Sequence, residues 1–288
     1  MVERIILILC YILLAPFLGG ILEGFDRKIS ARMQGRIGPP ARQPFYDLIK
    51  LFKKQYIVVN HSVHFLLLSY SALMILTGSM FFGGADLLLC FFVLSTAATF
   101  LYFAAVITNS PYSTIGAQRE LVQMMSYEPA VLLTAVGFYL ATGSFNVADI
   151  IQSDYSLIVK MPGFFVAFVF IMTIKMRKSP FDTAASHHPH QELVKGITTE
   201  MGGKNLGIFN VTEWYENVFL FGVVALFIMN KNPWSYLACA LVILFVYFIE
   251  ILIDNSCARV KYHLMLKMTW MVTLFSAGVN LLILMLIR

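Results

Sequence analysis

The chain has 288 residues, of which 59% are hydrophobic and only 13% are charged, with a formal net charge of +5. Soluble domains carry roughly 25% charged residues. A bilayer core about 30 Å thick needs roughly 20 apolar residues per helix, and this sequence supplies such stretches repeatedly. These properties exclude a soluble fold. They predict an all-α polytopic membrane protein surrounded by the lipid bilayer, with no nucleic-acid partner.

Eight stretches are predicted to span the membrane, and a ninth segment is amphipathic. The predicted spans are 4–23, 63–83, 86–107, 121–143, 160–178, 214–230, 234–253 and 264–287. The first is interpreted as a retained helix, because it lacks the small-residue cleavage site of a signal peptide. Between Pro44 and Lys54, apolar residues recur at helical spacing beside three lysines, which predicts an interfacial helix lying in the membrane surface.

Basic residues gather on one side of this predicted topology. The segments 24–62, 108–120, 175–213 and 254–267 hold 17 of the 21 Lys and Arg residues. Because cytoplasmic loops are rich in Lys and Arg, these segments are predicted to face the cytoplasm, with both termini on the outside of the cell membrane. The whole chain, 1–288, is predicted to be a single membrane domain with inside loops 24–62, 108–120, 179–213 and 254–263.

Several carboxylates lie in or beside the predicted spans, where charge is costly and commonly functional. The candidates for proton or charge coupling are Asp26, Glu128, Asp182, Glu192, Glu200, Glu213 and Glu216, with Arg119 as a counter-charge. Structural interpretations stay open for some of them. Glu213 and Glu216 begin a predicted helix, whose dipole favours negative charge in any case. Glu250 is near the inner end of the seventh span, where a basic loop residue can pair with it.

The loop before the sixth predicted span contains His187, His188 and His190. A metal site is one interpretation, but Pro189 separates the histidines and no fixed fourth ligand accompanies them. A proton relay suits them better, because imidazole titrates near neutral pH. The remaining alternatives are that they hold the loop together or face a partner protein. The four cysteines lack metal-ligand or redox spacing, so no metal or cofactor is predicted in this chain.

Four blocks of the sequence resemble, in the same order, the subunit 1/H family of respiratory complex I. They are 24–40 (GFDRKISARMQGRIGPP), 113–128 (STIGAQRELVQMMSYE), 179–182 (SPFD) with Glu192 downstream, and 214–216 (WYE). Asp26 stands where the family has Glu, which keeps the charge. Residues 186–192 (SHHPHQE) replace an acidic segment of quinone-reducing members. This variant is similar to the membrane subunit of energy-converting [NiFe] hydrogenases of the Ech and formate hydrogenlyase types.

The resemblance implies a non-catalytic subunit that links ferredoxin and hydrogen redox chemistry to proton or sodium translocation. It implies hydrogenase large and small subunits, an iron–sulfur subunit and an antiporter-like membrane subunit as partners, with ferredoxin as the electron donor. The [NiFe] centre and [4Fe-4S] clusters would belong to the partners. The docking loop for the hydrogenase arm would contain Arg27, Lys28, Arg32, Gln34, Arg36, Gly38 and Pro39.

Three other functions compete with this one. The chain can instead be the quinone- or phenazine-site subunit of a complex I-like dehydrogenase, with a lipophilic channel between the first and sixth spans and the amphipathic helix. It can also be an inert membrane anchor whose carboxylates are structural. A stand-alone secondary transporter would show internal repeats, and the sequence has none.

Overall fold

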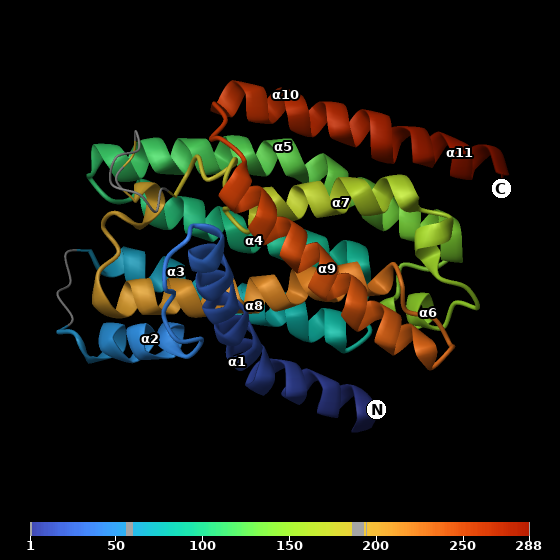
Figure 1. Ribbon diagram of the computed structural model, residues 1–288, viewed down its shortest axis with the longest axis horizontal. Coiled ribbons are helices and arrows are strands. Elements are labelled where there is room, and N and C mark those ends of the chain that lie inside the picture. The colour runs from blue at the N-terminus through green and yellow to red at the C-terminus, as the bar shows by residue number, and fades with distance from the viewer. Residues whose placement is uncertain (1, 56–59, 186–192, 194, 288) are drawn as a thin grey trace.

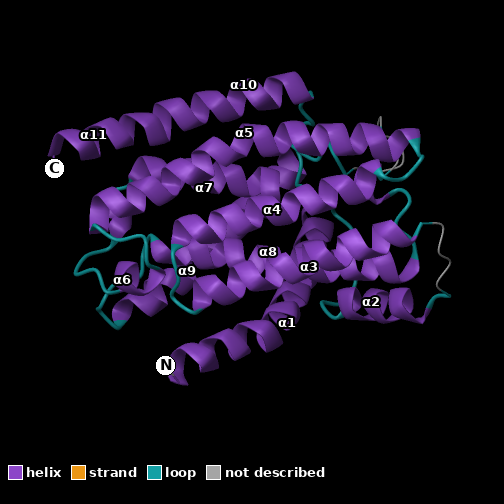
Figure 2. Ribbon diagram, turned by 180° about the vertical axis from the view of Figure 1, so that it is seen from behind, coloured by secondary structure: helices purple, strands orange, loops and turns teal. Residues whose placement is uncertain are grey.

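The computed structural model describes residues 2–55, 60–185, 193 and 195–287, and helices dominate it (Figures 1 and 2). In chain order these are α1 (Val2–Met33), α2 (Gln43–Lys53), α3 (His61–Phe82), α4 (Leu87–Val106), α5 (Pro111–Thr142), α6 (Val147–Ile151), α7 (Pro162–Lys175), α8 (Gly203–Leu226), α9 (Trp234–Ser256), α10 (Tyr262–Val272) and α11 (Val279–Ile287). A π-helical segment, Thr273–Gly278, joins α10 to α11. In the part of the chain that is described there is no strand, only an isolated bridge between Asp86 and Asn146.

Within the described residues, six helices are long and apolar enough to cross a membrane: α1, α3, α4, α5, α9 and the continuous α10–α11 helix. The apolar α7 is shorter, with 14 residues. Helix α8 has 24 residues, but the polar residues of its central turns lower its hydropathy. The prediction of an all-α polytopic membrane protein is therefore confirmed. Both termini lie at the same end of the bundle, as an even number of spans requires (Figure 1).

Three predicted boundaries were wrong by about ten residues each, and always because a helix continues into polar sequence. Helix α1 runs to Met33, α5 begins at Pro111, and α8 begins at Gly203. The predicted inside loop 108–120 is thus mostly helix, and the block from Asp26 to Arg32 is helical too. Polar side chains in these extensions form ion pairs with other parts of the chain, so they do not need water and do not end the helix.

The core of the bundle is formed by α3, α4, α5, α7 and α8, with α1 crossing α3 and α8 at a steep angle (Figure 1). Aromatic rings fill it. Phe219 of α8 lies edge-on to Phe81 and Phe91, with centroids 5.2 and 6.3 Å apart. Helix α1 bends along its length, and Pro16 within it removes a backbone donor. The amphipathic segment is confirmed as helix α2, which packs against α8 and α1.

Helix α1 packs tightly against the chain that leads into α2. A Cβ added at Gly24 would lie 1.9 Å from the carbonyl oxygen of Ala41. We expect Gly24→Ala to destabilise the protein by about 1–3 kcal/mol, because backbone must move to admit the methyl group. Thermal unfolding in detergent measures the change. Gly278→Ala is the matched control, since its nearest atom is 3.7 Å away. Equal melting temperatures for the two variants would contradict this packing.

Candidate functional site

A polar cavity of about 510 Å³ lies between α1, α8, α9 and the segment that follows α7. Charged side chains line it from every one of these elements, including Asp26 of α1, Glu213 and Glu216 of α8, and Asp254 of α9. Such a lining favours water and ions over an apolar molecule. The candidate site surrounds this cavity.

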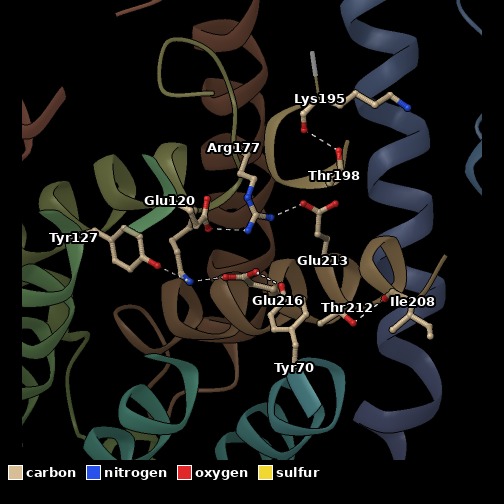
Figure 3. Close-up of polar contacts among 11 residues, drawn as sticks. Tyr70, Glu120, Tyr127, Arg177, Lys195, Thr198, Ile208, Thr212, Glu213 and Glu216 are labelled. Atoms are coloured by element: carbon tan, nitrogen blue, oxygen red, sulfur yellow. Dashed lines mark hydrogen bonds and ion pairs between the residues drawn. The ribbon is translucent and has the colours of Figure 1, made fainter. Parts of the chain in front are cut away.

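A buried ion pair joins α7 to α8 beside this cavity. The Nζ of Lys175, the last residue of α7, lies 2.6 Å from Oε1 of Glu216, and both side chains are only 5% exposed. Two hydroxyls complete the cluster, which Figure 3 shows. Lys175 donates to the Tyr127 hydroxyl of α5 at 3.3 Å, and the Tyr70 hydroxyl of α3 donates to Glu216 at 3.3 Å. Four helices therefore meet at one charge pair.

Arg177 connects two more carboxylates next to this pair (Figure 3). It donates to Glu213 of α8 at 2.6 Å and to Glu120 of α5 at 2.9 Å. Its guanidinium also lies over the ring of Phe209, 5.3 Å from the centroid. Burial disfavours the charge of Arg177, but the Glu120 and Glu213 carboxylates outweigh it and raise the pKa of Arg177 well above its ordinary value. Arg177 is therefore a permanent cation between two acids.

The same short segment makes three further contacts with distant parts of the chain. Lys178 lies 2.8 Å from Asp26 of α1, and the backbone N–H of Ser179 donates to Asp254 of α9 at 2.9 Å. Asp182 pairs with Arg259, beyond α9, at 2.8 Å. Residues 175–182 thus tie α1, α5, α8 and α9 together through charges.

Glu250 of α9 is the exception among these acids. It is fully buried, and neither of its oxygens has a hydrogen-bond partner in the described part of the chain. The charges that act on it are Lys178 and Asp254. An unpaired buried carboxyl is costly, which makes Glu250 a candidate functional residue.

A second charge network joins α1 to α2 and α8. Arg27 pairs with Glu23 at 2.5 Å and with Asp47 of α2 at 2.7 Å, and the Trp214 indole of α8 donates to Glu23 at 2.6 Å. Partial burial opposes ionisation of Asp47, but hydrogen bonds from Arg27 and Gln43 lower its pKa below the usual value. The Arg27–Asp47 ion pair between α1 and α2 is therefore formed at neutral pH, and it is lost as the pH falls through the lowered pKa of Asp47.

The structure brings together only some of the predicted coupling residues. Asp26, Asp182, Glu213 and Glu216 line the cavity. Glu128 is half-buried elsewhere on α5, and its carboxylate forms no hydrogen bond or ion pair with described residues. Glu200 is exposed, and Arg119 donates to the Thr183 carbonyl at 3.4 Å. Four other predicted residues, Glu192, His187, His188 and His190, lie outside the described residues.

The predicted docking residues divide into two groups. Arg27 is part of the α1–α2 network, and Gly38 and Pro39 are half-buried, with Gly38 close against Ala31. The others, Lys28, Arg32, Gln34 and Arg36, are exposed. Arg36 donates to Gln34 at 2.8 Å, and Gln34 donates to Asn255 of α9 at 2.9 Å. Lys28 and Arg32 are on helix α1 rather than in a loop.

Sequence reasoning missed the cations that organise the site. Lys175, Arg177 and Lys178 were counted only as loop charge, yet each is buried in a pair with a carboxylate. A signal was available, because three cations in four positions directly follow an apolar span. Glu120 was not among the predicted coupling residues either, but it is a buried partner of Arg177.

The fold and the site define a class of protein: a polytopic membrane protein whose helices are joined by buried ion pairs around a polar cavity. The chain belongs to the NADH dehydrogenase family, subunit 1/H, whose model matches residues 4–285.

Named relatives come from two kinds of complex. The chain is 29% identical to hydrogenase-4 component C of Escherichia coli, over 87% of each chain. It is 32% identical to the H subunit of NADH-quinone oxidoreductase from Campylobacter jejuni, over 72% of each. A chain of the membrane-bound sulfane sulfur reductase, an archaeal respiratory membrane complex, shares the fold, with a TM-score of 0.86 over 98% of this chain and 22% identity.

Proposed function

We propose that this chain is the membrane-anchoring and energy-coupling subunit of an energy-converting [NiFe] hydrogenase complex. The observation that carries the proposal is the run of buried charges around the cavity: Lys175 with Glu216, and Glu120 with Arg177 and Glu213. The named hydrogenase-4 relative and the family match support a subunit of a hydrogenase-like complex rather than an isolated anchor.

The proposed mechanism follows from the low dielectric around these charges. Charges interact more strongly in such surroundings than in water. A change in charge on a redox partner beside the cavity would therefore alter how tightly the buried carboxylates hold protons. Through their ion pairs, Glu216 and Glu213 would transmit this change in protonation to the helices that these pairs connect. Whether protons or sodium ions then move is decided by the membrane partners.

The redox groups would be held by the partners. Three of the four cysteines lie on different helices, Cys10 on α1, Cys90 on α4 and Cys239 on α9, and Cys257 directly follows α9. No three His, Cys, Asp or Glu residues gather into a metal-ligand group within the described ranges. As the family resemblance implies, we assign nickel, iron and the clusters to hydrogenase and iron–sulfur subunits, with ferredoxin as the donor and an antiporter-like subunit beside this chain in the cell membrane.

Purification of the intact complex from mildly solubilised membranes tests this function. Mass spectrometry of the co-purifying chains and nickel analysis are the readouts. Nickel together with a hydrogenase large subunit is the expected result. Absence of nickel, with dehydrogenase subunits and bound quinone in its place, would overturn the proposal.

A quinone- or phenazine-site subunit is the second candidate. The cavity between α1 and α8 favours it, since that is where this function requires a channel, and the NADH-quinone oxidoreductase relatives carry quinone in their names. The charged lining weighs against it, because a lipophilic ring would leave those charges without water. The same purification distinguishes the two.

Glu128 gives a direct test of proton coupling. Since its carboxylate has no partner among described residues, Glu128→Gln strands no opposite charge. We expect the melting temperature to stay within a degree or two of wild type, because a change without such a feature costs within about 0.5 kcal/mol. Hydrogen evolution is expected to lose its coupling to ion translocation, measured in sealed vesicles with an ion-sensitive dye. Wild-type coupling would remove Glu128 from the pathway.

Arg36 tests the docking surface. It is exposed, and its side-chain hydrogen bond among the described residues is to the Gln34 amide oxygen, so its removal disturbs little within the described part of the chain. Arginine is suited to bidentate contacts with acidic groups of a partner. We expect Arg36→Ala to reduce the hydrogenase subunits that co-purify by several-fold, whereas Arg4→Ala, an exposed arginine of the opposite end, leaves them unchanged. Equal recovery from both variants would rule out docking through Arg36.

A further inference from the structure

We propose that a basic groove at the start of α10 binds the headgroup of an acidic phospholipid. The groove has a volume of about 370 Å³ and is lined by Arg259, Val260, Lys261, His263, Leu264 and Lys267. It is separate from the polar cavity and shares no lining residue with it.

The described part of the chain leaves some of the positive charge in the groove without an ion-pair partner. Arg259 is paired: its Nε lies 2.8 Å from Asp182, and its Nη2 donates to the Asp182 carbonyl at 2.5 Å. Lys261 and Lys267, by contrast, are exposed and form no ion pair with any described residue. Their side chains are free to meet an anion. Ordinary positive-inside charge accounts for the sign of these residues but not for their placement around one groove.

Both lysines line the groove, one from the start of α10 and one from its second turn. Lys261 precedes α10, and Lys267 lies in its second turn, about 9 Å further along the axis. The first N–H groups of a helix carry a partial positive charge, so Tyr262 and His263 add to the field there. His263 is exposed in the same groove. A phosphate placed between the lysines would therefore meet donors from several directions.

An apolar stripe continues from the groove along the same helix, and it is the reason to choose a lipid over a soluble anion. Leu264, Met271 and Phe275 are 49%, 50% and 74% exposed. Their spacing of seven and then four residues places them on one helix face with Lys267. Acyl chains can lie along this stripe while the lysines reach the phosphate, as Lys side chains do near membrane surfaces. An acidic protein partner would not need the stripe.

The test compares two double variants of the full chain in its purified complex after removal of bound lipid. Lys261→Gln/Lys267→Gln removes the groove charge, and Lys50→Gln/Lys53→Gln removes two lysines from exposed positions of α2. Binding of dioleoyl phosphatidylglycerol is followed by native mass spectrometry and by the shift in melting temperature. Dioleoyl phosphatidylcholine and inorganic phosphate serve as the other two probes.

We expect the groove variant to bind phosphatidylglycerol about 20- to 30-fold more weakly, roughly fivefold for each lysine, and the α2 variant to bind it like wild type. Phosphatidylcholine should bind weakly to all three proteins. An equal loss of phosphatidylglycerol binding in both variants would show that only net charge matters, and it would overturn the proposal. Inorganic phosphate binding as tightly as the lipid would also overturn it. So would loss of a co-purifying subunit with unchanged lipid binding, which indicates a protein partner.

Discussion

Glu216→Gln should uncouple hydrogen evolution from ion translocation and also destabilise the protein by about 3–5 kcal/mol. The carboxylate of Glu216 lies 2.6 Å from Nζ of Lys175, and both side chains are buried. With a neutral amide in its place, the partners of Lys175 among the described residues are all uncharged: the amide oxygen, the hydroxyl of Tyr127 at 3.3 Å and the face of the Tyr127 ring. An ammonium left in such a place is strongly unfavourable.

A second substitution separates structure from mechanism. In Lys175→Met/Glu216→Gln the stranded cation is gone, and a methionine of similar length fills its space. We expect most of the lost stability to return, because a buried pair replaced as a whole is often close to neutral. Coupling should stay lost. If the double variant regains both stability and coupling, Glu216 is a structural residue and plays no part in ion movement.

Arg177→Gln is expected to have an effect of the same order, about 3–5 kcal/mol or more, with loss of coupling. One guanidinium balances Glu120 and Glu213 at 2.9 and 2.6 Å, so its removal leaves two acids facing each other across the site. Melting temperature and ion uptake by sealed vesicles are the measurements. A wild-type melting temperature would contradict the burial of this cluster.

Two further variants make the Arg177 prediction more specific. Arg177→Lys keeps the charge but loses the planar fork, so a single ammonium cannot bond both carboxylates equally well. It should be intermediate in stability. Arg177→Gln/Glu120→Gln removes one of the two stranded acids and should recover part of the stability that Arg177→Gln loses. No recovery in this double variant would mean that Glu120 does not depend on Arg177.

The amino-acid sequence by itself determined the class of fold. Repeated apolar stretches have no stable location except the bilayer, and backbone groups in lipid are satisfied only within helices or closed barrels. The family blocks around Asp26, Glu128, Asp182 and Glu216 were equally visible without a structure, and the match over 4–285 confirms the family. Polar residues such as Glu120 displaced the predicted helix boundaries, because hydropathy assumes that every charged side chain is exposed to water.

Only the tertiary structure decided which charges meet. Lys175, Arg177 and Lys178 are neighbours in the chain, yet their partners Glu216, Glu120 and Asp26 come from three different helices. No spacing rule along the chain predicts such contacts, because they depend on how the helices cross. Glu128 shows the converse, since its place in a matching block did not bring it to the cavity. Burial makes these pairs important for stability, because removing one partner of an ion pair that is shielded from water costs several kcal/mol, about 3–5, of folding free energy.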